Sequence, residues 1–349
     1  MNKIPVAILG ATGIVGQRFV QMLRNHPWFE ITALVGSDRS AGRTYREACN
    51  WVLEGDPPAN VLDQVVTPLS TDLPAKLVFS ALPSPIAREA EPLLAQAGFA
   101  VCSNASAFRQ DPDVPVIIPE VNGDHIKMVE WQSARRGWKG LIVTSPNCTT
   151  TGTVMPLKPL DEAFNITRFF VTSIQAVSGA GYPGLSFIDM TDNVIPYIKG
   201  EEEKIETESL LLLGRITDSE RQPANIKVSA QANRTAVQHG HTVCLSIEFE
   251  KKPTLDEAVE VLRNYRGPEI AWDLPSAPPK PILVRPEPDR PQPRRDRDTQ
   301  NGMVATVGRI RPCPIFNLKL VSVIHNAIRG AAGGSILNAE LLVSGGYLS

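Results

Sequence analysis

A cysteine at the end of an apolar run is the first residue with chemical potential in this sequence. Cys148 closes the stretch LIVTSPNC, and a segment of helical character follows it. The partial positive charge of a helix N-terminus lowers the pKa of a thiol, and the thiolate is the nucleophilic form. Backbone N–H groups at the same turn can receive an oxyanion. We therefore predict that Cys148 is a nucleophile. The other cysteines are expected to be buried apolar residues, at positions Cys49, Cys102, Cys244 and Cys313.

A cysteine nucleophile needs a base, and the chain has only five histidines. The stretch NRTAVQHGHTV carries His239 and His241, and Arg234 lies seven residues before His241. An arginine beside a cysteine–histidine pair indicates a substrate carboxylate or phosphate, because the guanidinium group binds both with two parallel hydrogen bonds. The two histidines would share one face of a regular strand, so position alone does not choose the base. Gly240 between them would let the backbone leave the strand.

The N-terminal residues have the pattern of a dinucleotide-binding unit. An apolar run is followed by GATGIVG and then by helical periodicity. In such a turn Gly10 permits the sharp bend, Gly13 lets the backbone approach a pyrophosphate, and Gly16 allows close helix packing. The spacing is GxxGxxG rather than GxGxxG, and an ordinary strand–helix turn is the alternative. The position at the very start of the chain favours the nucleotide site.

The tip of the second predicted strand bears on the choice between NAD and NADP. After EITALVG the sequence reads SDRSAGR, in which Ser37, Arg39, Ser40 and Arg43 suit a ribose 2′-phosphate. Asp38 would instead suit the free 2′-hydroxyl of NAD. The cluster is net basic, so we predict NADP. The alternative is that these are solvated loop residues.

Polar residues follow the later strand-like runs as well. These runs are KLVFSALPS, FAVCSNASAFR and LIVTSPNC. The carboxyl ends of strands in a doubly wound sheet open into one crevice. We therefore expect Asn104, Arg109 and Asn147 to converge near the cysteine, with Ser80 and Leu82 beside the cofactor.

Beyond the cysteine the pattern becomes that of an α+β domain. Residues 166–179 and 235–250 alternate in the manner of strands. Residues 254–265 have one apolar helical face, preceded by a capping box of Thr254 and Glu257. The stretch 275–293 holds eight prolines, and its composition fits either a linker or an ordered surface arm. The C-terminal residues have the period and small side chains of a helix that packs back on the first domain.

Composition excludes several classes of function. The 349 residues include 42% apolar residues, enough for two cores, and the net charge of −2 offers no basic surface for nucleic acid or membrane. No apolar run is long enough for a membrane span, and the N-terminal sequence lacks the pattern of a signal peptide. The scattered cysteines form no CxxC pair, which argues against a metal site or disulfides. A reducing cytoplasm is the simplest compartment.

Nine stretches together resemble the aspartate-β-semialdehyde dehydrogenase family, in the branch found in archaea and fungi. They follow the family's order from the first strand to the last helix, and the likeness covers essentially the whole chain. The resemblance implies an NADP-binding Rossmann domain over 1–147, a catalytic and dimerisation domain over 148–318, and a C-terminal helix over 319–349 that returns to the first domain. It also implies a homodimer or homotetramer. The stretches are GATGIVGQRF, SDRSAGRTY, NASAFR, SPNCTTTG, QAVSGAGYPG, GEEEKIETE, NRTAVQHGHT, RPQPRRDRD and HNAIRGAAGGSILNAELL.

The resemblance also implies roles for individual residues. The family reduces L-aspartyl 4-phosphate to L-aspartate 4-semialdehyde with NADPH, releasing inorganic phosphate, in the pathway to lysine, threonine and methionine. Glu202 is an alternative to its neighbour Glu201 for the substrate amine. The implied sets are Cys148 (nucleophile), His241 (acid–base), Gln175 and Asn147 for catalysis; Arg234 (carboxylate), Glu201 (amine), Arg109 and Lys204 (phosphate) for the substrate; and Gly10, Thr12, Gly13, Ile14, Val15, Ser37, Arg39, Ser40, Ser80, Leu82, Ser178, Gly179 and Asn326 for the cofactor.

Two other functions are consistent with the same fold. A CoA-thioester reductase such as malonyl-CoA reductase uses the same cysteine chemistry, but it needs neither an amine-binding glutamate nor two phosphate-binding cations. A non-catalytic NADP-binding protein would be expected to lack one or more of the site residues, and none is missing here.

Overall fold

A parallel five-stranded sheet, in the order β2-β1-β3-β4-β5, forms the first domain of the computed structural model, which describes residues 3–218 and 220–348. β3 and β4 are short runs that are buried on both faces, as is usual in a parallel sheet, whereas the edge strand β2 exposes Glu30 and Thr32. Their bounds are β1 Ile4–Leu9, β2 Phe29–Val35, β3 Leu77–Ser80, β4 Ala100–Ser103 and β5 Leu141–Thr144. The helices of this domain are α1 Ile14–Leu23, α2 Tyr45–Ala48, α3 Ala59–Leu62, α4 Ser84–Ala97, α5 Pro119–Asn122, η1 Gly123–Lys127 and α6 Met128–Arg136.

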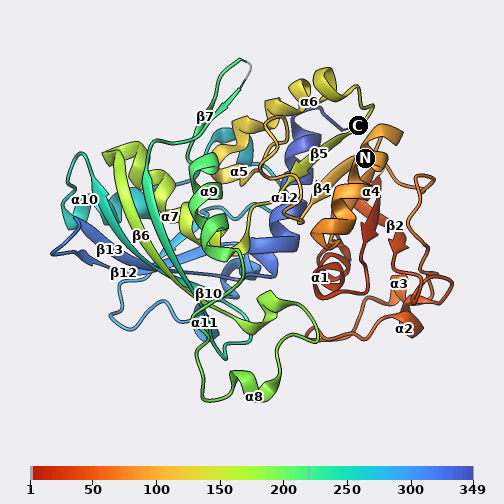
Figure 1. Ribbon diagram of the computed structural model, residues 1–349, viewed down its shortest axis with the longest axis horizontal. Helices are drawn as coiled ribbons and strands as arrows, with labels where there is room; N and C mark the ends of the chain where they lie inside the picture. The colour runs from red at the N-terminus through yellow and green to blue at the C-terminus, as the bar shows by residue number, and fades with distance from the viewer. Residues whose placement is uncertain (1–2, 219, 349) are drawn as a thin grey trace.

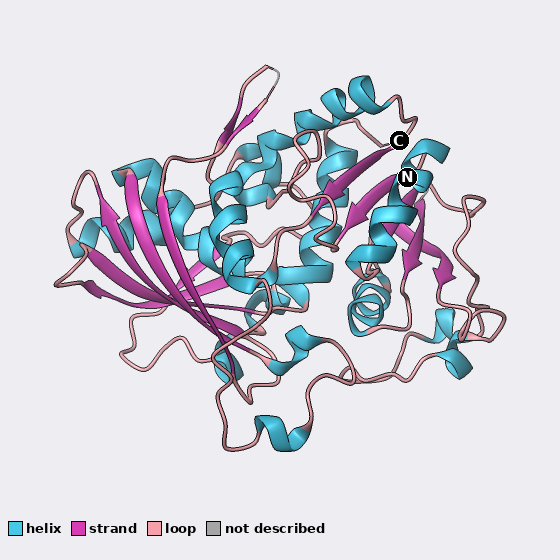
Figure 2. Ribbon diagram, viewed as in Figure 1, coloured by secondary structure: helices cyan, strands magenta, loops and turns pink. Residues whose placement is uncertain are grey.

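A six-stranded mixed sheet, in the order β11-β12-β13-β10-β6-β9, forms the second domain and lies beside the first (Figure 1). Its long strands are β6 Ile166–Gln175, β9 Lys227–Arg234, β10 His241–Phe249, β12 Ala305–Pro312 and β13 Leu318–Ile324, with the short β11 Ile282–Val284 at the edge (Figure 2). The helices are α7 Cys148–Phe164, α8 Phe187–Met190, α9 Glu201–Leu212, α10 Leu255–Asn264 and α11 Pro293–Asp296. Short elements complete the domain: β7 Arg215–Ile216, β8 Arg221–Gln222, η2 Val177–Ala180, η3 Glu269–Ala271 and η4 Thr299–Gly302.

The two faces of the second sheet differ in whether helices pack against them. Val243 and Leu245 of β10 share an apolar core with residues of α7 and α10, including Leu157 and Leu262. Because side chains alternate along a strand, the residues between them point to the other face. That face carries half-buried or exposed side chains that neighbour one another through the strand register, namely Phe170, Thr172, Ile174, Cys244, Ser246 and Val321.

The chain returns to the first domain at its C-terminal end. After β13 come the π-helical turn η5 Ile328–Ala332 and α12 Gly333–Ser344, which lies among first-domain elements in Figure 1. Ile336 and Leu337 of α12 share a core with Phe19 of α1. The predicted α/β class and the returning helix are thus confirmed. The boundary predicted at residue 318 needs correction, because β13 pairs with β10 and β12 and so belongs to the second sheet.

The proline-rich stretch 275–293 is an ordered arm. Within it β11 pairs in parallel with β12, and Arg290 donates to the buried Asp296 through Nε at 2.7 Å. The capping box of Thr254 and Glu257 is present at the start of α10. The buried face of α10 includes fewer residues than the sequence pattern predicted, because Leu255, at the start of the helix, is 40% exposed. Within the described residues no helix has both the length and the apolarity to cross a bilayer.

Candidate active site

The nucleophile candidate occupies the junction between a strand and a helix. β5 ends at Thr144, and Cys148 is the first residue of α7. Asn147 is the N-cap of this helix, and its Oδ1 accepts hydrogen bonds from the N–H groups of Thr149 at 2.9 Å and Thr150 at 3.1 Å. Asparagine is a preferred N-cap because its side chain satisfies these otherwise unpaired donors. The cap therefore fixes the backbone that carries the thiol.

Cys148 contacts a histidine at the start of a strand of the second sheet. Its Sγ lies 3.1 Å from Nε2 of His241, the first residue of β10. Nδ1 of the same ring accepts a hydrogen bond from the N–H of Ala176 at 3.0 Å. A neutral imidazole that accepts at Nδ1 carries its proton on Nε2, so this proton faces the sulfur. Burial, with Arg234 and His239 nearby, lowers the pKa of His241 to about 3, so the ring is neutral near pH 7.

The pKa of the thiol corrects an expectation from the sequence. Burial, reinforced by the negative charge of Glu201, raises the pKa of Cys148 to about 12, although Arg109, Arg234 and the N–H of Thr149 act in the opposite direction. The expected lowering by the helix N-terminus is therefore outweighed in this structure. The physical reason is desolvation, which disfavours the charged form of any buried thiol.

Glu201 lies at the centre of a hydrogen-bond cluster around the cap. Its carboxylate accepts from Nδ2 of Asn147 at 2.9 and 3.1 Å, from Nε2 of Gln175 at 3.3 Å and from Nζ of Lys204 at 3.0 Å. The neighbouring Glu202 instead accepts from the N–H of Ala232 on β9 at 2.9 Å. Of the two glutamates that the sequence left open, the geometry favours Glu201 for contact with a ligand.

Arg234 completes this side of the site at the end of β9. Its Nη1 donates to the carbonyl of Ala176 at 2.8 Å, and it forms no ion pair among residues 3–218 and 220–348. A side chain at Gly179 would place its Cβ 2.8 Å from that nitrogen and 3.1 Å from Cε1 of His241. A side chain at this position would therefore displace the guanidinium group of Arg234 from its place beside His241.

Arg109 approaches from the loop after β4, on the side of the first domain. Its Nη2 donates to the carbonyl of Asn104 at 2.8 Å, and its Nη1 donates to Glu208 at 2.9 Å. Nε of this arginine is buried and has no hydrogen-bond partner among the described residues. Glu208 also accepts from the N–H of Asn147 at 2.6 Å. Glu208 was not predicted from the sequence, although it lies seven residues after Glu201 in the same helix and therefore on nearly the same face.

The glycine-rich turn has the geometry that was predicted for it. Gly10 has a φ of +72°, and a Cβ on Gly16 would lie 2.2 Å from the carbonyl oxygen of Gly10. Gly13 is the N-cap of α1, which begins at Ile14. Thr12 and Val15 belong to the same turn, so free N–H groups at this helix end are available for a phosphate.

The tip of β2 presents fewer free groups than the sequence suggested. Ser37, Asp38 and Arg39 are exposed, but Ser40 is buried and its Oγ donates to the carbonyl of Ser37 at 3.0 Å. Ser40 therefore braces the turn. Ser80 at the end of β3 is completely buried, which leaves its side chain out of reach of the crevice. Leu82, two residues further on, is half-buried.

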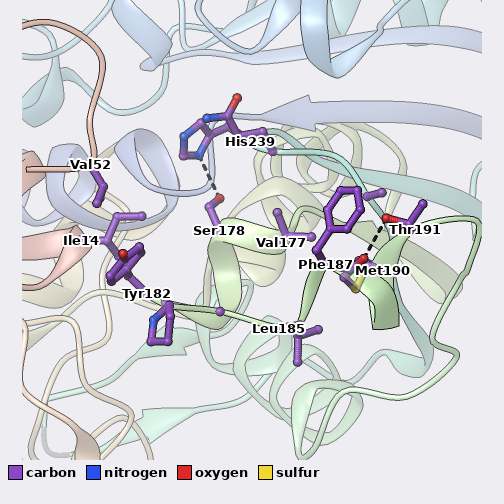
Figure 3. Close-up of a pocket in the computed structure, with 15 residues that line it drawn as sticks. Ile14, Val52, Val177, Ser178, Tyr182, Leu185, Phe187, Met190, Thr191 and His239 are labelled. Carbon is purple, nitrogen blue, oxygen red and sulfur yellow. Dashed lines mark hydrogen bonds between the residues drawn. The ribbon is translucent and has the colours of Figure 1, made fainter.

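Both domains contribute to one pocket of about 440 Å³ (Figure 3). Ile14 and Val52 face it from the first domain, and Ser178, Tyr182 and His239 face it from the second (Figure 3). Because Ile14 and Ser178 are both predicted cofactor residues, the pocket adjoins the predicted cofactor site.

The second-domain wall of this pocket is held by hydrogen bonds between segments that are distant in the sequence. Oγ of Ser178 accepts from Nδ2 of Asn326 at 2.9 Å, and Oδ1 of Asn326 accepts from the N–H of Gly240 at 2.9 Å. His239 is 2.9 Å from the same Oγ through its Nδ1, and its ring stacks on His325. His239 thus supports the pocket wall, whereas His241 faces the thiol. Gly240, with a φ of +103°, separates their directions.

Comparison with known proteins identifies the class. Residues 5–129 match the family model described as semialdehyde dehydrogenase, NAD binding domain, and residues 157–329 match semialdehyde dehydrogenase, dimerisation domain. The dinucleotide-binding unit predicted at the N-terminus is the first of these domains.

Individual relatives indicate the family within this class. Aspartate-semialdehyde dehydrogenase from Archaeoglobus fulgidus is 50% identical over 98% of both chains. The crystal structure of aspartate semialdehyde dehydrogenase with NADP from Candida albicans superposes with a TM-score of 0.91 and 40% identity, over 99% of this chain and 100% of that one. A malonyl CoA reductase (NADP) from Metallosphaera sedula is 38% identical over 99% of both chains. The chain belongs to the aspartate-semialdehyde dehydrogenase family, as the resemblance implied.

Proposed function

We propose that this chain converts L-aspartyl 4-phosphate to L-aspartate 4-semialdehyde through a thioester on Cys148, in the cytoplasmic pathway to lysine, threonine and methionine. The observation that carries the proposal is the 3.1 Å contact between the Cys148 Sγ and His241 Nε2, made where Glu201, Arg234 and Arg109 converge. A thiol paired with a neutral imidazole and surrounded by charges of both signs suits an acyl group that carries an amine, a carboxylate and a phosphate.

The chemistry follows from the positions of these groups. The sulfur of Cys148 attacks the acyl carbon, the bond from that carbon to the phosphate oxygen breaks, and phosphate leaves with the bonding electrons and the proton of the thiol. NADPH, when bound, supplies the hydride that reduces the resulting thioester. His241 gives its Nε2 proton to the oxygen of the tetrahedral adduct and takes it back as the carbon–sulfur bond breaks. The aldehyde leaves, and the sulfur regains its proton from solvent.

Substrate recognition uses the charged groups around the thiol. Glu201 binds the substrate amine and Arg234 binds the carboxylate with its planar guanidinium. Arg109 and Lys204 bind the phosphate. Because Lys204 forms an ion pair with Glu201 at 3.0 Å, the amine and the phosphate of the substrate would replace this internal pair with two new ones.

The cofactor is NADP in this proposal. Support comes from the exposed Ser37 and Arg39 at the tip of β2 and from the NADP named for the Candida albicans structure. Arg39 would pair with the 2′-phosphate, and the turn from Thr12 to Val15 would hold the pyrophosphate. Ser178, Gly179 and Asn326 would line the same cofactor site.

The assembly is a homodimer, alone or within a tetramer. The match to a dimerisation domain supports this, as does the open face of the second sheet around Phe170, Ile174 and Cys244. Phe170→Glu would place a charge on this face and should release monomers, which light scattering can detect. If the variant keeps the molar mass of the unmodified protein, this face is not part of the subunit interface.

A CoA-thioester reductase is the second candidate, favoured by the relative from Metallosphaera sedula. One experiment separates the two: NADP reduction by L-aspartate 4-semialdehyde in the presence and absence of phosphate, beside NADPH oxidation by malonyl-CoA. Phosphate-dependent reduction supports the dehydrogenase. Activity with malonyl-CoA but not with the semialdehyde would show that the chain is a CoA-thioester reductase instead.

A further inference from the structure

Glu208 joins two parts of the proposed site without facing the substrate itself. It is buried on α9, with 1% of its surface exposed. Its Oε2 accepts from the N–H of Asn147 at 2.6 Å, and its Oε1 accepts from Nη1 of Arg109 at 2.9 Å. One carboxylate thus connects the residue before the nucleophile with a cation from the other domain.

The bond to Asn147 completes the cap of the nucleophile's helix. In a capping box, a Glu or Gln at the third helical position accepts from the N–H of the N-cap residue. Here that position is Thr150, which offers no carboxylate. Glu208 supplies the missing acceptor from a neighbouring helix. The turn that presents Cys148 is therefore tied to α9.

The bond to Arg109 orients a guanidinium group whose Nε–H has no partner among the described residues. Its Nη1 is held by Glu208 and its Nη2 by the carbonyl of Asn104, while the buried Nε has no partner among the described residues. A rigid planar group held at two of its nitrogens presents its remaining N–H groups in defined directions. The unpaired Nε–H suits an anionic oxygen.

We infer that Glu208 is a positioning residue that sets the distance between the phosphate-binding Arg109 and the Cys148 thiol. The inference rests on the proposed function. The phosphate must leave from, or attack, the carbon bound to the sulfur, so the arginine that binds phosphate has to be held at a fixed distance from the thiol. Glu208 fixes this distance because its one carboxylate binds both Arg109 and the N–H of Asn147.

The test is Glu208→Gln, assayed by phosphate-dependent reduction of NADP with L-aspartate 4-semialdehyde. Glutamine can accept from either Asn147 or Arg109 through its oxygen, but its amide then meets the other donor. We expect kcat/KM for phosphate to fall by about 10- to 100-fold, the range for loss of one charged hydrogen bond. The KM for the semialdehyde should stay unchanged. Glu203→Gln is the matched control, because it removes the same charge from an exposed position of the same helix.

A double-mutant cycle separates positioning from a merely structural role. In an Arg109→Ala background, the oxygen of the introduced glutamine can accept from the N–H of Asn147 without competition. Adding Glu208→Gln to Arg109→Ala should therefore lower kcat/KM for phosphate hardly any further. If the losses simply add, Glu208 does not act through Arg109 and the inference fails. The inference also fails if the KM for phosphate decreases in Glu208→Gln. That result would mean that the negative charge of Glu208 only reduces the attraction of Arg109 for phosphate.

Folding and the proposed function have their own readouts. NADP binding shows whether each variant is folded, and Glu208→Asp carries the test if the glutamine variant is not, because its shorter side chain cannot span both donors. If Glu203→Gln is active and Glu208→Gln matches it, the inference alone is refuted. If the unmodified chain shows no phosphate-dependent activity, the proposed function is refuted instead.

Discussion

Replacing the two neighbouring histidines one at a time tests the assignment of the acid–base group. His241→Asn removes the titrating group that contacts the Cys148 sulfur at 3.1 Å. General acid–base catalysis contributes about 10²- to 10⁴-fold, so kcat should fall by that factor with a modest change in KM. His239→Asn removes the contact with Ser178 and the stack on His325. It should therefore weaken NADP binding and leave kcat near that of the unmodified chain.

The pH dependence of stability gives a second readout for the same residue. Burial lowers the pKa of His241 to about 3 in the folded chain, whereas an unfolded histidine titrates near 6.5. Between these values the unfolded state binds more protons, so this residue makes the protein less stable as the pH falls from about 6.5 towards 3. In His241→Asn, the slope of the unfolding free energy in this window should decrease by up to about 1.4 kcal/mol per pH unit.

Steady-state kinetics and denaturant unfolding at several pH values measure these effects. A crippling His239→Asn beside a mild His241→Asn would show that the roles are exchanged and that the motif has been misread. Equal slopes of unfolding free energy in the variant and the unmodified chain would show that His241 is not buried as a neutral ring.

Three further substitutions test the thiol, the carboxylate site and the cofactor site. Cys148→Ser should abolish dehydrogenase activity and leave NADP binding intact, because a hydroxyl is a far weaker nucleophile and a poorer leaving group; turnover near that of the unmodified chain would exclude the thioester. Arg234→Lys should raise the KM for the semialdehyde strongly, since lysine lacks the planar fork and loses roughly 1.5–3 kcal/mol with one charged hydrogen bond; an unchanged KM places Arg234 outside the substrate site. Arg39→Ala should weaken NADP more than NAD in a binding titration, and equal losses for both would mean that Arg39 does not read the 2′-phosphate.

Features that depend on a few consecutive residues could be predicted from the sequence. Gly10 and Gly16 bracket a turn in which one needs a positive φ and the other leaves no room for a side chain. Asn147 caps the helix that begins at the cysteine, and Thr254 starts α10 with a capping box. Glycine freedom and cap preference act within one turn of the chain, so residue type and order are sufficient.

Other features depend on packing between distant segments. Glu201 and Glu202 are adjacent, and only the way α9 packs against β9 turns one to the Asn147 cap and the other to Ala232. His239 and His241 share a motif, yet they face different groups because the backbone bends at Gly240. Strand and helix periodicity did not distinguish the members of either pair, and only the family resemblance favoured Glu201 and His241.

The chemistry of the thiol was also decided by tertiary structure. The groups that govern it come from far along the chain, since His241 lies 93 positions from Cys148, and Glu201 lies 54 positions from Asn147. Burial and the negative charge of Glu201 raise the pKa of the thiol, which the helix N-terminus alone would lower. Desolvation and the electric field depend on distances in space, which a residue's neighbours in the sequence do not determine.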